Sequence, residues 1–261
     1  ADLPAATAWA DTFWNAEDPA RWPLAFTMEG EASRDFLPVW SALPVEQNEA
    51  NRKVVRVLRR QDPASGLELR VEVVLYSAWP VVEWTAFLKN AGQSHSPELR
   101  RLLAADVFFE GSEFTLHGIE GDSNSAASFA PYEWQAQPGT ARIFGAGKSG
   151  KSTSGPDGWP YFNLAGPGQE GRILVLGWPG EWSAAFSAEN GGLRWFAGQE
   201  RTQFRLRAGE SVRFPSVTIM FWQGGDWVNA QNLWRRWYRE AVLPHPPGGR
   251  LVRPTVVVGR R

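Results

Sequence analysis

The chain has 261 residues, with 27 basic and 28 acidic side chains and a net charge of −1. This length allows one large domain or two small ones with an ample core, and a near-neutral chain has no general attraction to nucleic acid or to an anionic membrane. The sequence contains no Cys, which excludes a disulfide framework and thiolate metal sites.

The first 50 residues are rich in Pro and Trp. Because frequent prolines disfavour long helices and central strands, we expect edge strands and covering loops there. Residues 1–14 lack a basic n-region and a long apolar h-region, so no signal peptide is predicted, and no stretch approaches the roughly 18 apolar residues of a membrane span. The chain starts at Ala, which suggests trimming, and the localisation stays open between extracellular and cytoplasmic.

Short apolar segments separated by turn residues run through the middle of the chain. Residues 67–75 alternate between apolar and charged side chains, which is typical of an antiparallel strand with one exposed face. Asn190-Gly191 predicts a hairpin because these residues tolerate positive φ. Further turns are predicted at residues 61–66, 90–92 and 207–210. The other candidate strands are residues 54–58, 81–88, 102–109, 114–117, 159–164, 173–176, 182–188, 193–196, 202–206 and 217–222.

Residues 226–243 are the one convincing helix. Asp226 can cap it and Pro244 stops it. One apolar stripe at helical spacing predicts that this helix packs on a sandwich or a neighbouring domain: Trp227, Ala230, Leu233, Trp234, Trp237 and Ala241. Many short strands and one terminal helix predict an all-β sandwich over residues 1–245. Residues 246–261 are expected to be a linker or the start of a following domain.

Aromatic side chains are concentrated around turns, and Trp is the outlier of the composition with 15 residues. Residues 158–186 combine an apolar strand at 173–176 with aromatic segments and Gly-Pro turns. Residues 118–160 are rich in Gly, Ser and Pro with embedded aromatics, and we expect an ordered, functional loop. Rings fixed at the rim of a sheet form flat apolar platforms that match the faces of sugar rings, so carbohydrate is the first ligand class to consider.

Several stretches resemble one known family in a common order over residues 50–250. They are WPVVEW at 79–84, LKNAG at 88–92, His117-Gly118, residues 147–164 ending in PYFNL, GWPGEW at 177–182, and NLWRRW at 232–237 leading to Pro244. In these residues the chain resembles the N-terminal domain of the glycoside hydrolase family 36 α-galactosidases. The resemblance implies a β-supersandwich of two large antiparallel sheets. It also implies that a (β/α)8 barrel with two catalytic aspartates would follow.

The sequence ends at Arg261, about where the first barrel strand would begin. We therefore expect a non-catalytic carbohydrate-binding or accessory domain, with no catalytic residue, metal or cofactor of its own. The resemblance implies that loops of this domain reach the sugar pocket of a barrel, in the same or a neighbouring subunit. The candidate ligand-binding residues are Trp134, Trp159, Tyr161, Trp178, Trp182, His117, Asp122 and Lys148.

Two alternatives are open at this point. A self-contained glycosidase would need two carboxylates facing one pocket, and the loops offer Glu120, Asp122, Glu133 and Asp157 without a spacing that selects a pair. An oligomerisation or interaction domain would use the same aromatics against protein. Nucleotide binding is excluded: residues 147–149 read Gly-Lys-Ser, but position 142 is Arg where the phosphate loop needs Gly.

Overall fold

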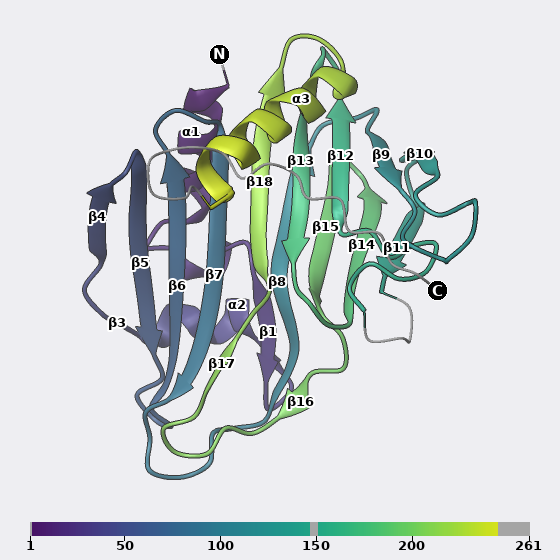
Figure 1. Ribbon diagram of the computed structural model, residues 1–261. Helices are drawn as coiled ribbons and strands as arrows, with labels where there is room; N and C mark the ends of the chain where they lie inside the picture. The colour runs from purple at the N-terminus through teal and green to yellow at the C-terminus, as the bar shows by residue number, and fades with distance from the viewer. Residues whose placement is uncertain (1, 147–150, 245–261) are drawn as a thin grey trace.

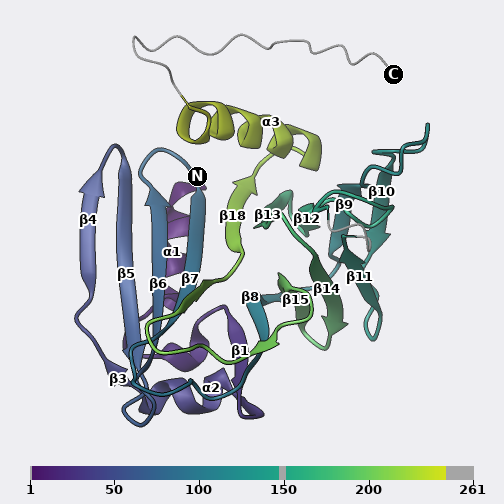
Figure 2. The same cartoon turned by 60° about the horizontal axis from the view of Figure 1, so that its bottom comes forward.

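The computed structural model describes residues 2–146 and 151–244, which form two antiparallel sheets packed face to face (Figure 1, Figure 2). In order of pairing, the smaller sheet has β11 (Ala141–Gly145), β14 (Trp182–Glu189), β15 (Gly192–Gln199), β8 (Leu99–Glu110), β1 (Ala25–Met28) and β2 (Glu31–Ala32), with β16 (Gln203–Phe204) beside β8. The expected two-sheet antiparallel sandwich is confirmed.

The larger sheet carries most of the predicted strands. In order of pairing it has β10 (Pro131–Gln135), β9 (Thr115–Ile119), β12 (Tyr161–Gly166), β13 (Glu170–Gly177), β18 (Ser216–Gln223), β7 (Val81–Asn90), β6 (Leu67–Tyr76), β5 (Lys53–Gln61) and β3 (Ser41–Ala42), with β4 (Glu46–Ala50) beside β5 and β17 (Ser211–Arg213) beside β7. The alternation predicted for β6 is confirmed, because its apolar face is buried and its charged face half-exposed. Gly191 adopts φ +84° in the predicted hairpin turn.

The main core fills the space between the two sheets and is unusually aromatic. Trp84, Trp182 and Trp195 are all at most 1% exposed. The indole Nε1 of Trp84 on β7 donates to the carbonyl oxygen of Ala104 on β8 at 2.7 Å, so one side chain joins the two sheets. Much of the tryptophan excess therefore lies in the core, where large rings bury the most apolar surface.

The prediction of loops and edge strands for the first 50 residues was wrong in part, because the chain begins with helix α1 (Leu3–Phe13). Pro4 lies in the first turn of this helix, where its missing N–H is unpaired in any case. Ala6 and Ala10 are buried, and Trp9 stacks on Trp84 with ring centroids 5.7 Å apart. Short helical turns follow: η1 (Pro19–Arg21), α2 (Ser33–Phe36) and η2 (Leu37–Val39).

The C-terminal helix is confirmed as α3 (Trp227–Trp237), which continues as a π-helical turn, η3 (Tyr238–Val242). Asp226 caps it by accepting from the Asn229 N–H at 2.8 Å. The helix lies across the outer face of the larger sheet, over β18, β13 and β12 (Figure 1). All members of the predicted stripe contribute to a second apolar cluster between helix and sheet: Trp227, Ala230, Leu233, Trp234, Trp237 and Ala241.

The loop-rich region predicted at residues 118–160 is shorter in the structure, because β10 and β11 lie within it. Neither strand shows a sustained apolar alternation: the burial of β10 alternates between exposed and half-buried only. Lys148 and the expected linker at 246–249 lie outside the described residues. The division of the chain at residue 245 stays a prediction.

Candidate functional site

Two loops meet at one end of the sandwich and form what we call the loop rim, residues 120–130 and 151–160. The Asp122 N–H donates to the Thr153 carbonyl at 2.8 Å, and the Gly155 N–H donates back to the Asp122 carbonyl at 3.0 Å. The backbones are in direct contact, since a Cβ on Gly121 would lie 2.5 Å from the Gly155 oxygen and one on Gly158 2.1 Å from the Ser154 oxygen. The loop rim is therefore an ordered, closely packed surface.

Two aromatic rings stand on the loop rim. Phe129 and Trp159 make an edge-to-face contact with centroids 5.6 Å apart at 85°. Phe129 is 48% exposed and holds φ +64°, a left-handed conformation that costs a bulky residue on the order of 1–3 kcal/mol. The half-buried Trp159 donates its indole N–H to no described residue. An exposed phenyl ring against a half-buried indole whose N–H bonds to no described residue is suited to a ligand with an apolar face and hydroxyl groups.

Polar groups flank this ring pair. The Asp122 carboxylate accepts from the Asn124 N–H at 2.9 Å and from the Ser128 hydroxyl at 3.0 Å. These hydrogen bonds, with the attraction of Lys151, lower the pKa of Asp122, so the group is a fixed anionic acceptor at neutral pH. The loop rim thus brings together Asp122 and Trp159 from the predicted site residues and adds Phe129, which the sequence analysis noted only as an embedded aromatic.

Two other predicted residues are held in packing contacts away from the ring pair. Trp182 is fully buried in the main core, and its Nε1 donates to the Ser152 carbonyl at 2.6 Å, so it anchors the loop rim from below. Tyr161 faces α3 and meets the ring of Trp234 edge-on at 5.4 Å. Burial raises the pKa of the Tyr161 hydroxyl. Trp182 therefore presents no surface to a sugar, whereas Tyr161 is half-buried and its assignment to a sugar surface stays a prediction.

The remaining predicted residues lie apart from the loop rim pair. His117 is 8% exposed and stacks on Trp227 of the helix, with centroids 4.3 Å apart and planes at 6°. Trp134 on β10 and Trp178 in the β13–β14 turn are half-buried against the main core. His117 is therefore packed against the helix, and Trp134 and Trp178 each leave only part of the indole ring accessible to a ligand.

The loop carboxylates do not form an evident catalytic pair. Glu133 faces His117, with Oε2 3.5 Å from Nδ1, and Asp157 faces Arg142, with Oδ1 3.9 Å from Nη2. Each thus has a basic neighbour, as in ordinary surface pairing. No group of three or more His, Cys, Asp or Glu side chains in the described residues could hold a metal ion.

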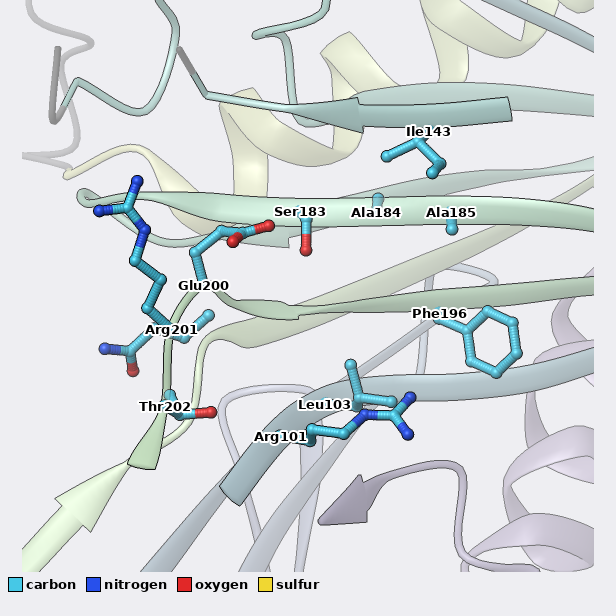
Figure 3. Close-up of a pocket in the computed structure, with 11 residues that line it drawn as sticks. Arg101, Leu103, Ile143, Ser183, Ala184, Ala185, Phe196, Glu200, Arg201 and Thr202 are labelled. Atoms are coloured by element: carbon cyan, nitrogen blue, oxygen red, sulfur yellow. The ribbon is translucent and has the colours of Figure 1, made fainter. Parts of the chain in front are cut away.

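A trough of about 470 Å³ lies on the outer face of the smaller sheet (Figure 3). Ile143, Ala185 and Phe196 pair in one row across β11, β14 and β15. Directly opposed residues point to the same face, so a small side chain between two large ones leaves a hollow. Ser183 continues the floor on β14. Ile143 is 71% exposed, an unusual state for a large apolar side chain on a sheet face.

Charged groups stand at one end of the trough, on the turn after β15 and on β8 (Figure 3). Arg201 pairs loosely with Glu181 at 3.7 Å. Neither Arg101 nor Glu200 makes a side-chain ion pair with a described residue, so both are open to a ligand. The sequence analysis missed this site because its residues come from four separate strands and meet only through strand register.

The geometry defines a two-sheet β-supersandwich with one capping helix, and known structures share it. The α-galactosidase of Lactobacillus brevis matches with a TM-score of 0.63 at 15% identity, over 84% of this chain and 31% of that one. The glycoside hydrolase family 36 α-galactosidase AgaA of Geobacillus stearothermophilus, solved in complex with stachyose, matches at 0.65 and 16%, over 86% and 33%. The α-N-acetylgalactosaminidase NagBb of Bifidobacterium bifidum matches at 0.52 and 12%, over 84% and 33%.

These likenesses establish that the chain has the fold of a part of the family 36 α-galactosidases, as the sequence motifs indicated. The chain spans about a third of the length of those structures. No protein-family model and no curated protein matches the sequence. Within the described residues, no helix has the length and apolar character needed to cross a membrane.

Proposed function

We propose that this chain is a non-catalytic, carbohydrate-associated domain that binds saccharide at the loop rim. The observation that carries the proposal is the contact of the exposed Phe129 ring with the half-buried Trp159 ring, on the same loop rim as the Asp122 carboxylate. A sugar ring would place its C–H face on an indole or phenyl ring while its hydroxyls bond to the carboxylate and the free indole N–H. Binding of this kind needs no metal.

The shared fold supports the ligand class. One of the similar α-galactosidases, AgaA, was solved in separate structures with stachyose and with raffinose, and those complexes belong to much longer chains. We infer that bond cleavage belongs to a catalytic barrel, in the same polypeptide or a partner, and that this sandwich acts as an accessory to it. The loop rim is the surface through which such a domain would contact the same class of sugar, and assembly into a homo-oligomer is compatible with that role.

Isothermal titration of the folded chain with stachyose tests the proposal. We expect measurable binding that Trp159→Ala reduces at least about fivefold, because stacking of a ring on one aromatic side chain, as measured for bases, contributes about 1–3 kcal/mol. Tyr238→Ala is the matched control: this residue is 42% exposed on the distant π-helical turn, so its loss removes a similar ring without touching the loop rim. No binding by the folded wild-type protein to stachyose or other galactosides would overturn the proposal.

A further inference from the structure

A second cavity, of about 190 Å³, adjoins the trough on the outer face of the smaller sheet. Phe196 lines the trough and Asp106 lines the second cavity, and these two residues are directly opposed in the pairing of β15 with β8. Opposed residues in an antiparallel pair have Cβ atoms about 5 Å apart and face the same side. The two cavities are therefore neighbours, separated by a single pair of side chains.

Three arginines from distant parts of the chain line this second cavity: Arg21 of η1, Arg34 of α2 and Arg194 of β15. Asp106 lies at their centre with its carboxylate only 7% exposed. Arg194 donates to it through Nε at 2.8 Å and Nη2 at 3.1 Å, and Arg34 donates through Nη2 at 3.2 Å. The hydrogen bonds that Arg194 donates to Asp106 raise the pKa of Arg194, and Asp106 fixes two guanidinium groups in place.

The arginines keep unused capacity after this pairing. A guanidinium has five N–H donors, of which Arg194 commits two and Arg34 one to Asp106. Arg21 contacts the ring of Phe13 at 5.6 Å and has no carboxylate partner among the described residues. Three guanidinium groups and one carboxylate line the cavity, a surplus of two positive charges. Planar donor groups in this arrangement suit an oxyanion.

Apolar surface surrounds these charges and continues into the trough. Phe13 and Phe108 line the second cavity, and Phe108 is 36% exposed. The guanidinium of Arg194 lies over the Phe196 ring at 5.0 Å, so the boundary between the cavities is itself an aromatic and cationic surface. A ligand that fits both cavities combines ring faces with a negative charge. A small inorganic anion would use the arginines but leave the trough and its aromatic wall empty.

We propose that the outer face of the smaller sheet binds an anionic oligosaccharide, with one sugar unit in the trough against Phe196 and an acidic group of the next in the arginine cavity. The ligand class rests on the proposed function, while the site is separate from the loop rim. The oxyanion can be a planar carboxylate or a tetrahedral sulfate ester on the sugar. Both present anionic oxygen acceptors to the arginine N–H groups.

Isothermal titration with trigalacturonate at low salt tests this site, with a sulfated galactan trisaccharide as the second arm and neutral galactotriose as the reference. We expect the anionic trisaccharides to bind more tightly than galactotriose and the difference to shrink with added salt. Arg21→Gln should weaken trigalacturonate about fivefold and leave stachyose binding at the loop rim unchanged. Tighter binding of trigalacturonate identifies a carboxylate as the preferred oxyanion, and tighter binding of the sulfated trisaccharide identifies a sulfate ester.

Arg235→Gln is the matched control, since Arg235 is exposed on α3 and its loss changes the net charge equally. Phe196→Leu should weaken trigalacturonate more than monogalacturonate, because only the longer ligand reaches the trough. Thermal unfolding verifies that each variant is folded. Equal weakening by Arg21→Gln and Arg235→Gln, or no preference for anionic saccharides, overturns the inference. The stachyose titration separates that outcome from failure of the proposed function.

Discussion

Asn163 holds the C-terminal helix to the larger sheet. Its side chain is fully buried on β12, where Nδ2 donates to the Trp227 carbonyl at 2.8 Å and Oδ1 accepts from the Trp222 indole at 3.0 Å. A buried amide that satisfies two partners is difficult to replace, because each partner left unpaired costs about 1–3 kcal/mol. The docking of α3 therefore depends on one polar residue within an otherwise apolar cluster.

Replacing Asn163 by Ala should lower the free energy of unfolding by about 3 kcal/mol, since the Trp222 N–H and the Trp227 carbonyl lose their partner. Urea denaturation followed by far-UV circular dichroism measures the change. Asn232→Ala, at an exposed position of α3, should stay within about 0.5 kcal/mol of wild type. A loss at Asn163 no larger than at Asn232 would show that the helix is held by apolar contact alone.

His117 should make the stability dependent on pH. Burial against Trp227 lowers the pKa of this histidine below its ordinary value near 6.5, partly offset by Glu133. At a pH between the lowered pKa of the folded state and the ordinary value near 6.5, the unfolded chain binds a proton at His117 that the folded chain does not. Stability is therefore full above about pH 6.5 and declines as the pH falls.

Unfolding free energies of wild type and His117→Gln at pH 7.5 and 5.5 check this expectation. The variant should lose less stability between the two values than wild type does, whereas His95→Gln, at an exposed position, should behave as wild type. An unchanged pH dependence in His117→Gln would mean that other groups set the acid sensitivity.

The burial of individual aromatic side chains was partly predictable from the sequence. Trp182 begins the strand predicted at 182–188, and strand alternation places it on the same face as Ala184 and Phe186, which are buried. That signal argued for the core. Tyr161 could not be placed in this way, because it lies on the opposite face of β12 from Phe162, and only the docking of α3 covers that face. Tertiary packing decided its environment.

At the scale of elements, the two long helices differ in how well the sequence predicts them. Helix α3 has an aspartate cap, a stop at Pro244 and a complete apolar stripe, three local signals that agree. Helix α1 has no side-chain cap and carries Pro4. A proline is tolerated in the first turn of a helix and disfavoured further inside, and the sequence alone did not show where this helix begins. Strands β10 and β11 were missed because neither has an apolar run that distinguishes a strand from a polar loop.

In addition to the backbone hydrogen bonds that the loop rim accepts from Gly145 and Leu176, Trp182 attaches the loop rim to the core through its hydrogen bond to the Ser152 carbonyl. Trp182→Phe keeps most of the buried ring and removes this bond, so we expect a loss of about 1–3 kcal/mol in stability and faster amide exchange in residues 151–158. Hydrogen exchange with mass spectrometry measures the change. Trp195→Phe is the control, because its buried Nε1 has no partner in the described residues. Equal exchange in both variants would show that the loop is held by its own backbone contacts.

At the scale of the whole molecule, the sandwich carries two surfaces for which we propose different ligands. The loop rim lies at one end with an aromatic pair and a fixed carboxylate, while the trough and arginine cavity lie on the outer face of the smaller sheet. The overall fold was predictable because motif order and strand alternation survive at about 15% identity to structures of the same fold. The trough was not predictable, because it depends on the register among four strands.

The indole N–H signals in a nitrogen–proton NMR spectrum test the central claim most directly, since the chain has 15 tryptophans and Trp159→Phe identifies the signal of Trp159. We expect titration with stachyose to shift the Trp159 signal and to leave the buried Trp182 signal in place. Saturating sugar that moves no indole signal, or moves others while Trp159 is unaffected, would contradict saccharide binding at the loop rim.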